Sequence, residues 1–250
     1  MQNTLLVGLS RQVALGRELD VIANNIANLN TTGFKAEGSL FEEFLDTNAR
    51  ADQSRNRVSF VRDRGSWHDL SAGPIEKTGN PLDVAIDGNA FLAVQTPRGE
   101  RYTRNGSMHI NPQGQLVNSE GDAVLGEAGP ITFQPTDNQV AISADGTVSV
   151  REGNGTVDSQ RGKLKLVAIT NNQNLQKEGN SNFSVAGETP QPTKASRLMQ
   201  GTIEKSNVRS VIEMTRMIEV TRSYTQVANM ISQQADMQKN AMNKLAEVPA

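Results

Sequence analysis

The chain has 250 residues, of which 36% are hydrophobic and only 4% aromatic, so a single large core is not expected. Its formal net charge of −2 gives no electrostatic reason to expect nucleic acid as a partner. Cysteine is absent, which excludes disulfides, thiolate catalysis and cysteine metal sites. No apolar run approaches the roughly 20 residues of a spanning helix, so membrane insertion is not expected either.

Residues 4 to about 29 are predicted to form an amphipathic helix. Its apolar residues recur at alternating steps of four and three, at Leu15, Leu19, Ile22, Ile26 and Leu29. This period is typical of a helix that packs against other helices. The start lacks the basic region of a cleavable signal peptide. The helix is expected to end in an asparagine cluster before Gly33, because Asn and Gly tolerate the left-handed conformation that ends helices. The cluster consists of Asn24, Asn25, Asn28 and Asn30.

Residues 34–80 are predicted to form an extended connecting segment. Phe34, Phe41, Phe44 and Leu45 suggest a short amphipathic turn or helix within it. Residues 46–64 are rich in Arg, Asp, Asn and Ser, which predicts an extended or mobile stretch with little to bury. Its arginines alternate with acidic residues, so a solvated stretch is favoured over a phosphate site.

Residues 81–200 are predicted to form the central β domain. Short runs of β-branched residues alternate with dipeptides that favour tight turns. These dipeptides are Asp87-Gly88, Asn105-Gly106, Asp145-Gly146 and Asn154-Gly155. Their density predicts a mainly antiparallel sheet or small barrel, because crossover helices have no room. Residues 171–206 are predicted to be loop-like.

Residues 201–250 are predicted to contain the C-terminal helix, with Ser206 or Asn207 as its N-cap and its end near Leu245. The apolar series again alternates by three and four. It consists of Met214, Met217, Thr221, Tyr224, Ala228, Ile231, Ala235, Gln238, Met242 and Leu245. At roughly 58 Å, this helix is too long for a small domain to cover fully.

These elements predict an α+β fold, in which paired N- and C-terminal helices pack like a coiled coil and flank the central β domain. Residues 1–33 are expected to be the N-terminal helical part. Two ordinary surface helices on a globular core remain the alternative on periodicity alone.

The residues give no support for catalysis, a cofactor or a metal. The two histidines, His68 and His109, lie in different segments and are interpreted as surface or sheet residues. Asp83 and Asp87 could be a carboxylate pair, but a strand-end and a turn residue are favoured. No zinc-protease, nucleophile-elbow, phosphate-loop or dinucleotide motif is present.

Four stretches resemble the bacterial flagellar rod and hook proteins. Residues 23–35 resemble the N-terminal signature of that family, and residues 80–88 resemble the start of its β domain. Residues 102–106 and 114–117 resemble its first hairpins, and residues 201–208 with 213–218 resemble its C-terminal signature. The signature residues are Asn24, Asn25, Asn28, Asn30, Gly33, Phe34, Ser206, Asn207 and Val208.

The resemblance implies a structural axial protein without enzymatic activity and without cofactors. It implies that the two termini pair as the inner helical domain of the rod. It also implies that the chain is exported through the flagellar type III export apparatus to the basal-body rod, which spans the periplasm. The partners would be further copies of the chain and other rod and hook–basal-body proteins. The expected assembly interface consists of Leu15, Leu19, Ile22, Ile26, Leu29, Met214, Met217, Tyr224, Ala228 and Ile231.

Within the family, the chain is most similar to the proximal-rod member, and a distal-rod member of similar size is the alternative. Two other classes stay open at this point. One is a cytoplasmic β-barrel binding module that dimerises through its helices. The other is a hydrolase using His109 and Asp87.

Overall fold

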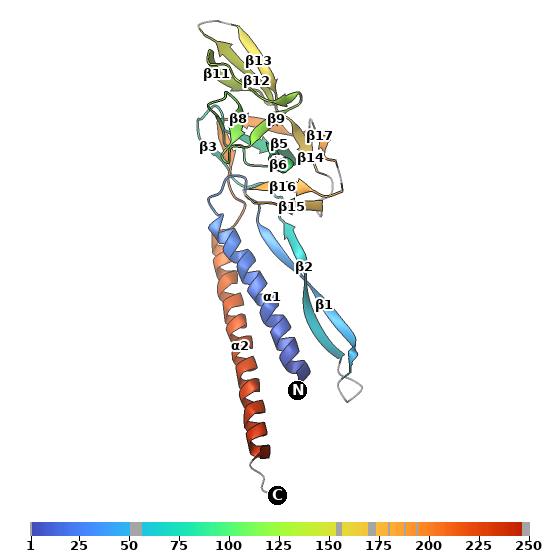
Figure 1. Ribbon diagram of the computed structural model, residues 1–250. Helices are drawn as coiled ribbons and strands as arrows, with labels where there is room; N and C mark the ends of the chain where they lie inside the picture. The colour runs from blue at the N-terminus through green and yellow to red at the C-terminus, as the bar shows by residue number, and fades with distance from the viewer. Residues whose placement is uncertain are drawn as a thin grey trace. The chain divides into compact units, whose positions relative to one another are not determined.

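The computed structural model describes residues 2–50, 57–153, 157–169, 174–179, 181–187, 189–193 and 195–246, and it contains two compact units (Figure 1). The first, here the helical unit, comprises residues 1–27, 37–67 and 209–250. The second, here the β unit, comprises residues 28–36 and 68–208. Both ends of the chain therefore contribute to both units, and the predicted connecting segment 34–80 is divided between them.

The helical unit contains two helices and a two-stranded sheet. The helices are α1 (Gln2–Ala27) and α2 (Ser210–Ala246), and the strands are β1 (Glu37–Arg50) and β2 (Arg57–His68). Helix α1 contacts both α2 and β1. The two predicted terminal helices are confirmed, and α1 begins and ends two residues earlier than expected.

The turn or helix predicted around Phe34, Phe41, Phe44 and Leu45 is wrong, because residues from Glu37 onward form β1, which pairs with β2. The apolar run is too short to separate the two periods, so strand pairing decides the conformation. Gly38 permits that pairing: a Cβ there would lie 2.4 Å from Nε1 of Trp67. Residues 57–64, expected to be extended or mobile, belong to β2. Residues 51–56 of the same stretch lie outside the described residues.

The predicted N-cap of the C-terminal helix is also wrong. Helix α2 begins at Ser210, and the N–H of Glu213 donates to the carbonyl of Arg209. The Ser206 hydroxyl accepts the N–H of Val208, which is two residues before the helix. The side chain of Asn207 bonds to other segments, described below, because tertiary partners compete with local capping.

The described residues of the β unit form seventeen short strands. They are β3 (Ile75–Lys77), β4 (Val84–Asp87), β5 (Ala90–Thr96), β6 (Gly99–Thr103), β7 (Met108–Ile110), β8 (Leu116–Asn118), β9 (Ala123–Gly126), β10 (Gly129–Pro130), β11 (Asp137–Ile142), β12 (Thr147–Glu152), β13 (Asp158–Lys163), β14 (Leu166–Ala168), β15 (Leu175–Lys177), β16 (Asn182–Val185), β17 (Gln191–Pro192), β18 (Arg197–Gln200) and β19 (Thr202–Glu204). The predicted loop-like stretch 171–206 is therefore wrong where β15 to β19 form. These strands are two to four residues long, too short for a periodic signal.

The main sheet follows the order β15-β16-β6-β5-β9-β8-β7, with β14 also on β5, β17 on β14 and β10 on β9. Strands β11, β12 and β13 form a second sheet, and β18 pairs with β4 and β19 with β3. The strand pairs described for this unit are antiparallel, as predicted. The turns at Gly88 and Gly146 adopt positive φ angles, whereas Asn154-Gly155 lies outside the described residues.

Strand β5 is buried on both faces, which fixes where the core lies. Ala90, Leu92 and Val94 join one apolar cluster, with residues of β4, β8, β12 and β18. Phe91 and Ala93 join a second cluster, with residues of β6, β14 and β16. Since successive side chains of a strand point to opposite faces, β5 sits between two cores.

Candidate assembly surface and buried ion cluster

The two helices of the helical unit run in opposite directions along each other. Gly8, near the start of α1, lies against Ile231 in the second half of α2. Glu18, further along α1, accepts hydrogen bonds from Arg216 near the start of α2, at 2.8 Å from Nη2. Because α1 numbers rise as α2 numbers fall, the pair is antiparallel.

One row of residues forms the buried side of α2. Val220 and Val227 are its most buried members. The row, here the packed row, consists of Glu213, Met217, Val220, Tyr224, Val227, Ile231, Gln234 and Gln238, and the other six members are half-buried. Its alternating steps of four and three are the period of helix–helix packing.

Only every second residue of the predicted α2 series belongs to the packed row. Met217, Tyr224 and Ile231 lie on the packed row, half-buried. Met214 is 50% exposed and Ala228 is half-buried, and both lie one residue away from packed positions. On the helix surface, the residues Met217, Tyr224 and Ile231 have one neighbouring line of residues on each side. Combining them with either line gives the same alternation of three and four residues. The branched apolar Val220 and Val227 take the buried side, so the flank with Met214 and Ala228 faces outward.

On α1, Ile22 is fully buried, and Leu15, Leu19 and Ile26 are half-buried. Leu29 lies beyond the helix, in the β unit. The buried positions that the prediction missed are Ala14, Val21 and Asn25. They were missed because α1 packs on two elements, α2 and β1, whereas the sequence pattern was interpreted as a single contact face.

A second row on α2 stays exposed in this structure. Val211, Met214 and Ile218 are 73%, 50% and 53% exposed. The row continues at the same stepping through smaller residues, and it is here called the exposed row. It consists of Val211, Met214, Ile218, Thr221, Thr225, Ala228, Ser232 and Ala235, all of which are exposed except the half-buried Ala228. Helix α1 has a matching exposed surface in its first half, formed by Leu6, Leu9 and Val13.

The asparagine cluster at the end of α1 has divided roles. Asn25 is buried and does not cap the helix: its Nδ2 donates to the carbonyl of Glu37 at 2.8 Å, and its Oδ1 accepts the Glu37 N–H at 2.9 Å. Asn25 therefore pairs with the first residue of β1 as another strand would. Asn28 accepts the Thr31 hydroxyl and N–H in the turn after the helix, as an end residue should. Asn24 and Asn30 are exposed.

Three charged side chains, each about 1% exposed, meet inside the β unit. They are Lys35, Arg104 and Glu204, here the ion cluster. Lys35 Nζ donates to Glu204 Oε1 at 2.6 Å, and Arg104 Nε donates to Glu204 Oε2 at 2.9 Å. Both cations also donate to carbonyls, Lys35 to that of Ser71 and Arg104 to that of Ile86. A single carboxylate thus forms ion pairs with two buried cations.

Backbone geometry lets the carboxylate take a third donor. The N–H of Gly73 donates to Glu204 Oε1 at 2.9 Å. A Cβ at residue 73 would lie 2.0 Å from the carbonyl oxygen of Lys205, so only glycine allows this close approach. With donors on both oxygens, Glu204 meets the requirement that buried charges be paired and hydrogen-bonded.

The pKa values of Lys35 and Glu204 both lie below their usual values, for different reasons. Burial lowers the pKa of Lys35 from 10.5, although the hydrogen bond to Glu204 and its charge oppose the shift. Burial alone would raise the pKa of Glu204, but the Lys35 hydrogen bond and the Arg104 charge hold it below 4.5. Glu204 therefore remains ionised at neutral pH.

The signature residues from the two chain ends surround this cluster. The N–H of Gly33 donates to the carbonyl of Glu204 at 2.7 Å, and Asn207 Oδ1 accepts the N–H of Ala36 at 2.7 Å. Asn207 Nδ2 donates to the carbonyl of Asp69 at 2.8 Å. Phe34 is buried, with Lys177 Nζ 3.8 Å from its ring centre. The structure thus brings the N-terminal and C-terminal signatures together.

Sequence reasoning missed the ion cluster, although all three residues lie in the stretches that carried the family resemblance. Lys35 is the single charged residue of 23–35, and Arg104 is the single charged residue of 102–106. A charge isolated among apolar and small residues could have signalled burial. Its partner could not be inferred, because Glu204 lies 169 and 100 residues away along the chain.

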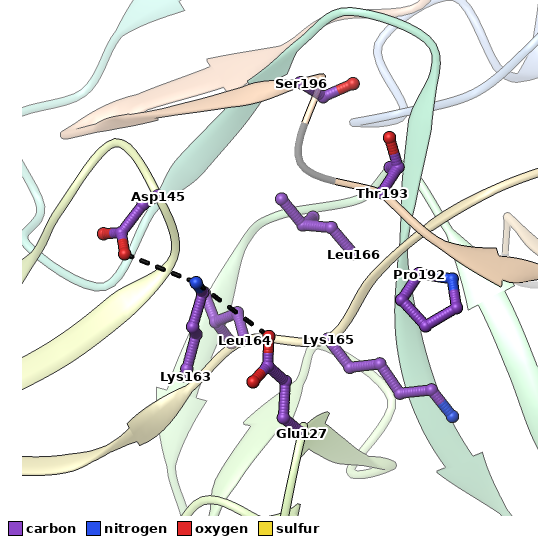
Figure 2. A pocket seen from close by; sticks show the side chains of 9 residues that line it. All are labelled: Glu127, Asp145, Lys163, Leu164, Lys165, Leu166, Pro192, Thr193 and Ser196. Carbon is purple, nitrogen blue, oxygen red and sulfur yellow. Dashed lines mark ion pairs between the residues drawn. The ribbon is translucent and has the colours of Figure 1, made fainter.

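The β unit also contains a pocket of about 460 Å³, shown in Figure 2. Leu164, Leu166 and Pro192 form its apolar wall. Lys163 Nζ lies 3.4 Å from Asp145 Oδ2 and 3.9 Å from Glu127 Oε1, so these charges pair with one another at the rim (Figure 2). Among the described residues that line the pocket, no nucleophile with a neighbouring base is present.

The candidate catalytic residues occupy ordinary structural positions. His109 is exposed on β7, and His68 stacks edge-on against Phe183. Asp83 accepts a hydrogen bond from Asn80, and Asp87 is exposed at the end of β4. Within the described ranges, no three His, Asp or Glu side chains gather as a metal site would require. Neither helix, over its described length, is apolar enough to cross a bilayer.

Three family models match the chain in order. Residues 5–35 match the flagella basal body rod protein model, residues 85–150 the flagellar hook protein FlgE/F/G D1 domain, and residues 199–244 the flagellar basal body rod FlgEFG protein C-terminal model. The first and third matches contain the two signatures that meet around the ion cluster. The chain therefore belongs to the family of flagellar rod and hook proteins.

Full-length relatives narrow the comparison. The chain is 39% identical to the flagellar basal-body rod protein FlgF of Caulobacter vibrioides, over 99% of this chain and 100% of that protein. It is 36% identical to the FlgF of Mesorhizobium japonicum, over 98% of each chain. It is 30% identical to the flagellar basal-body rod protein FlgG of Bacillus subtilis, over 97% of this chain and 99% of that protein.

Proposed function

We propose that this chain is a structural subunit of the proximal part of the bacterial flagellar basal-body rod. Similarity over the full length to relatives named FlgF supports this assignment, and the lower identity to the FlgG of Bacillus subtilis favours it over a distal position. The chain would assemble with further copies of itself and with other rod and hook–basal-body proteins. Its role is mechanical, as part of the drive shaft, and it requires no catalysis or cofactor.

The observation that carries the proposal is the exposed row of α2. The row begins with three large apolar side chains that are at least half exposed, and exposed apolar patches on soluble proteins often mark binding sites. The row starts at Val211 and has the heptad stepping of a helix–helix contact. The exposed row lies beside the packed row on the surface of α2. A neighbouring helix that packs on the exposed row would therefore extend the packing that α1 and α2 already make.

Side-chain size supports a neighbouring α1 as one occupant of that row. Leu6, Leu9 and Val13 lie at the level of Ile231, since Gly8 contacts that residue. The exposed row at this level consists of small side chains, such as Ala228. A neighbouring subunit at the same height would therefore place large residues against small ones, as knobs-into-holes packing requires.

The route to the rod follows from the same assignment. The subunit would leave the cytoplasm through the flagellar type III export apparatus and join the rod where it crosses the periplasm.

A charge in the exposed row tests the proposal. Ile218→Asp should abolish motility and incorporation into basal bodies, because burying an unpaired carboxylate in a helix–helix contact costs several kcal/mol. The purified monomer should keep its circular dichroism, since residue 218 is exposed there. Gln226→Asp, also exposed but on another side of α2, is the matched control and should swim normally. Wild-type motility of the Ile218→Asp strain would refute the proposed interface.

The proximal position is tested separately from assembly. Cryo-electron microscopy of purified basal bodies should locate the chain in the proximal part of the rod. Density for the chain in the distal part would replace the proximal assignment with a distal one while leaving the rod function intact. Its absence from basal bodies would overturn both.

A further inference from the structure

The ion cluster sets an order in which the parts of the β unit can come together. Its anion, Glu204, is separated from Arg104 by 100 residues and from Lys35 by 169. Until Glu204 arrives, burying either cation would leave a charge without a partner, which is among the costliest defects in a protein interior. The two cations therefore cannot take their final buried positions early.

The short segment 33–36 depends on the same late residues. Its Gly33 N–H bonds to the carbonyl of Glu204, its Ala36 N–H bonds to Asn207 Oδ1, and its Phe34 carbonyl accepts the Asn207 N–H at 3.4 Å. Residues 204–207 in turn reach the loop before β3 through Gly73. One set of contacts thus holds both chain ends onto the β unit.

The rest of the β unit is connected without these residues. The main sheet and the three-stranded sheet β11-β12-β13 are each complete within residues 90–192. Strands β18 and β19, at the C-terminal end of the β unit, pair with β4 and β3 in separate two-stranded sheets. The segments that Glu204 controls therefore lie at the margin of a core that already has its own hydrogen bonds.

We propose that residues 33–36 and 204–207 are the last part of the β unit to close and the first to open, and that Glu204 makes them move as one cooperative unit. A chain whose residue 204 is not yet available, because it is still being synthesised or translocated, would hold its N-terminal segment undocked. The inference concerns the chain by itself and does not rest on the proposed function.

Native-state hydrogen exchange on the full chain tests the cooperative opening. The amides of Gly33, Ala36, Gly73 and Asn207 report on the closing contacts. In Glu204→Gln they should exchange roughly a hundredfold faster, because the variant breaks a buried ion pair. The core amides Ala93, Leu116 and Leu164, which bond to backbone carbonyls within residues 114–165, should keep their rates. Equal acceleration of both sets would overturn the proposal, and so would no acceleration of the first.

Refolding kinetics test the order. Glu204→Gln should speed unfolding and leave the refolding rate within about twofold, as expected for a contact absent from the transition state. Val94→Ala, in the middle of buried β5, is the contrasting variant and should slow refolding. A refolding rate that falls at least tenfold in Glu204→Gln would show early closure and refute the order. If Glu204→Gln does not fold, Asn207→Ala serves instead, because it removes the uncharged side-chain hydrogen bonds that hold the same segments together. The same criteria then apply to its unfolding and refolding rates.

Discussion

The two units of this molecule treat their side chains in opposite ways. The helical unit leaves large apolar residues such as Val211, Ile218 and Met242 more than half exposed, while its packed row contains Glu213, Gln234 and Gln238. The β unit buries apolar residues on both faces of β5 and joins Lys35, Arg104 and Glu204 in a buried ion cluster. The β unit therefore has a complete core within one chain, whereas the helical unit exposes apolar surface on which other chains could pack.

The largest expected effect comes from removing one member of the ion cluster in the β unit. Arg104→Met should lower its free energy of unfolding by about 3–5 kcal/mol, because Glu204 loses a buried partner. Replacing Lys35, Arg104 and Glu204 together with Met, Met and Leu should cost much less, since no charge is left unpaired. Urea unfolding of the full chain measures both.

Lys205→Met is the control for these variants. Lys205 pairs with Glu76 at 3.0 Å at the surface, so its loss should change stability by no more than about 0.5 kcal/mol. A loss below about 1 kcal/mol in Arg104→Met would mean that the ion cluster does not hold the β unit together.

The next effect separates the two rows of α2. Val227→Ala removes buried volume from the packed row and should destabilise the helical unit by about 1–2 kcal/mol. Ile218→Ala, in the exposed row, should change monomer stability by less than about 0.5 kcal/mol yet weaken self-association. Thermal unfolding monitored on the helices and sedimentation at rising concentration measure the two outcomes. Equal destabilisation by both variants would erase the distinction between the rows.

A smaller effect is expected on the stability of the β unit at acidic pH. The folded-state pKa of Glu204 lies below its usual 4.5, so its stabilisation is fully present above about pH 4.5 and is lost as pH falls below that value. Glu204→Gln should therefore flatten the acid limb of the stability profile. Part of the limb should remain, because Asp137 and Glu178 also have lowered pKa values, through Arg161 and Arg101. An unchanged limb in the variant would contradict the assigned shift.

The smallest effect is expected at the ion pair between the helices. Glu18→Gln should cost less than about 1 kcal/mol, because Arg216 is 43% exposed and solvent screens the pair. Urea unfolding followed at the helices measures it. A cost of several kcal/mol would mean that charge, more than the packed row, holds α1 on α2.

Sequence predicted well the features that are periodic or local. Both terminal helices, the antiparallel β character and the turns at Gly88 and Gly146 could be anticipated. The α2 register was half right, because Met217, Tyr224 and Ile231 of the predicted series belong to the packed row, whereas Met214, Thr221 and Ala228 belong to the exposed row. The spacing of apolar residues alone does not show which side of α2 another helix covers. In the folded structure, the position of α1 determines which side is buried.

Long-range pairing accounts for what the sequence could not predict. Strand β1 forms because β2 lies beside it, and Asn25 is buried because β1 begins at Glu37. The ion cluster joins Lys35, Arg104 and Glu204 from three distant stretches. None of these partners is adjacent in the chain, so no local pattern encodes them. The assembly role of the predicted interface residues remains a prediction.

The contrast between a finished β unit and an unfinished helical unit can be tested by amide hydrogen exchange on the dilute, confirmed monomer. Helices gain most of their stability from packing, and most of the exposed row of α2 is open to solvent in the monomer. We expect fast exchange along residues 4–29 and 208–245 and strong protection of β5, β6 and β9. Strong protection of both helices in the monomer would contradict this account, because the helical unit would then be complete without its neighbours.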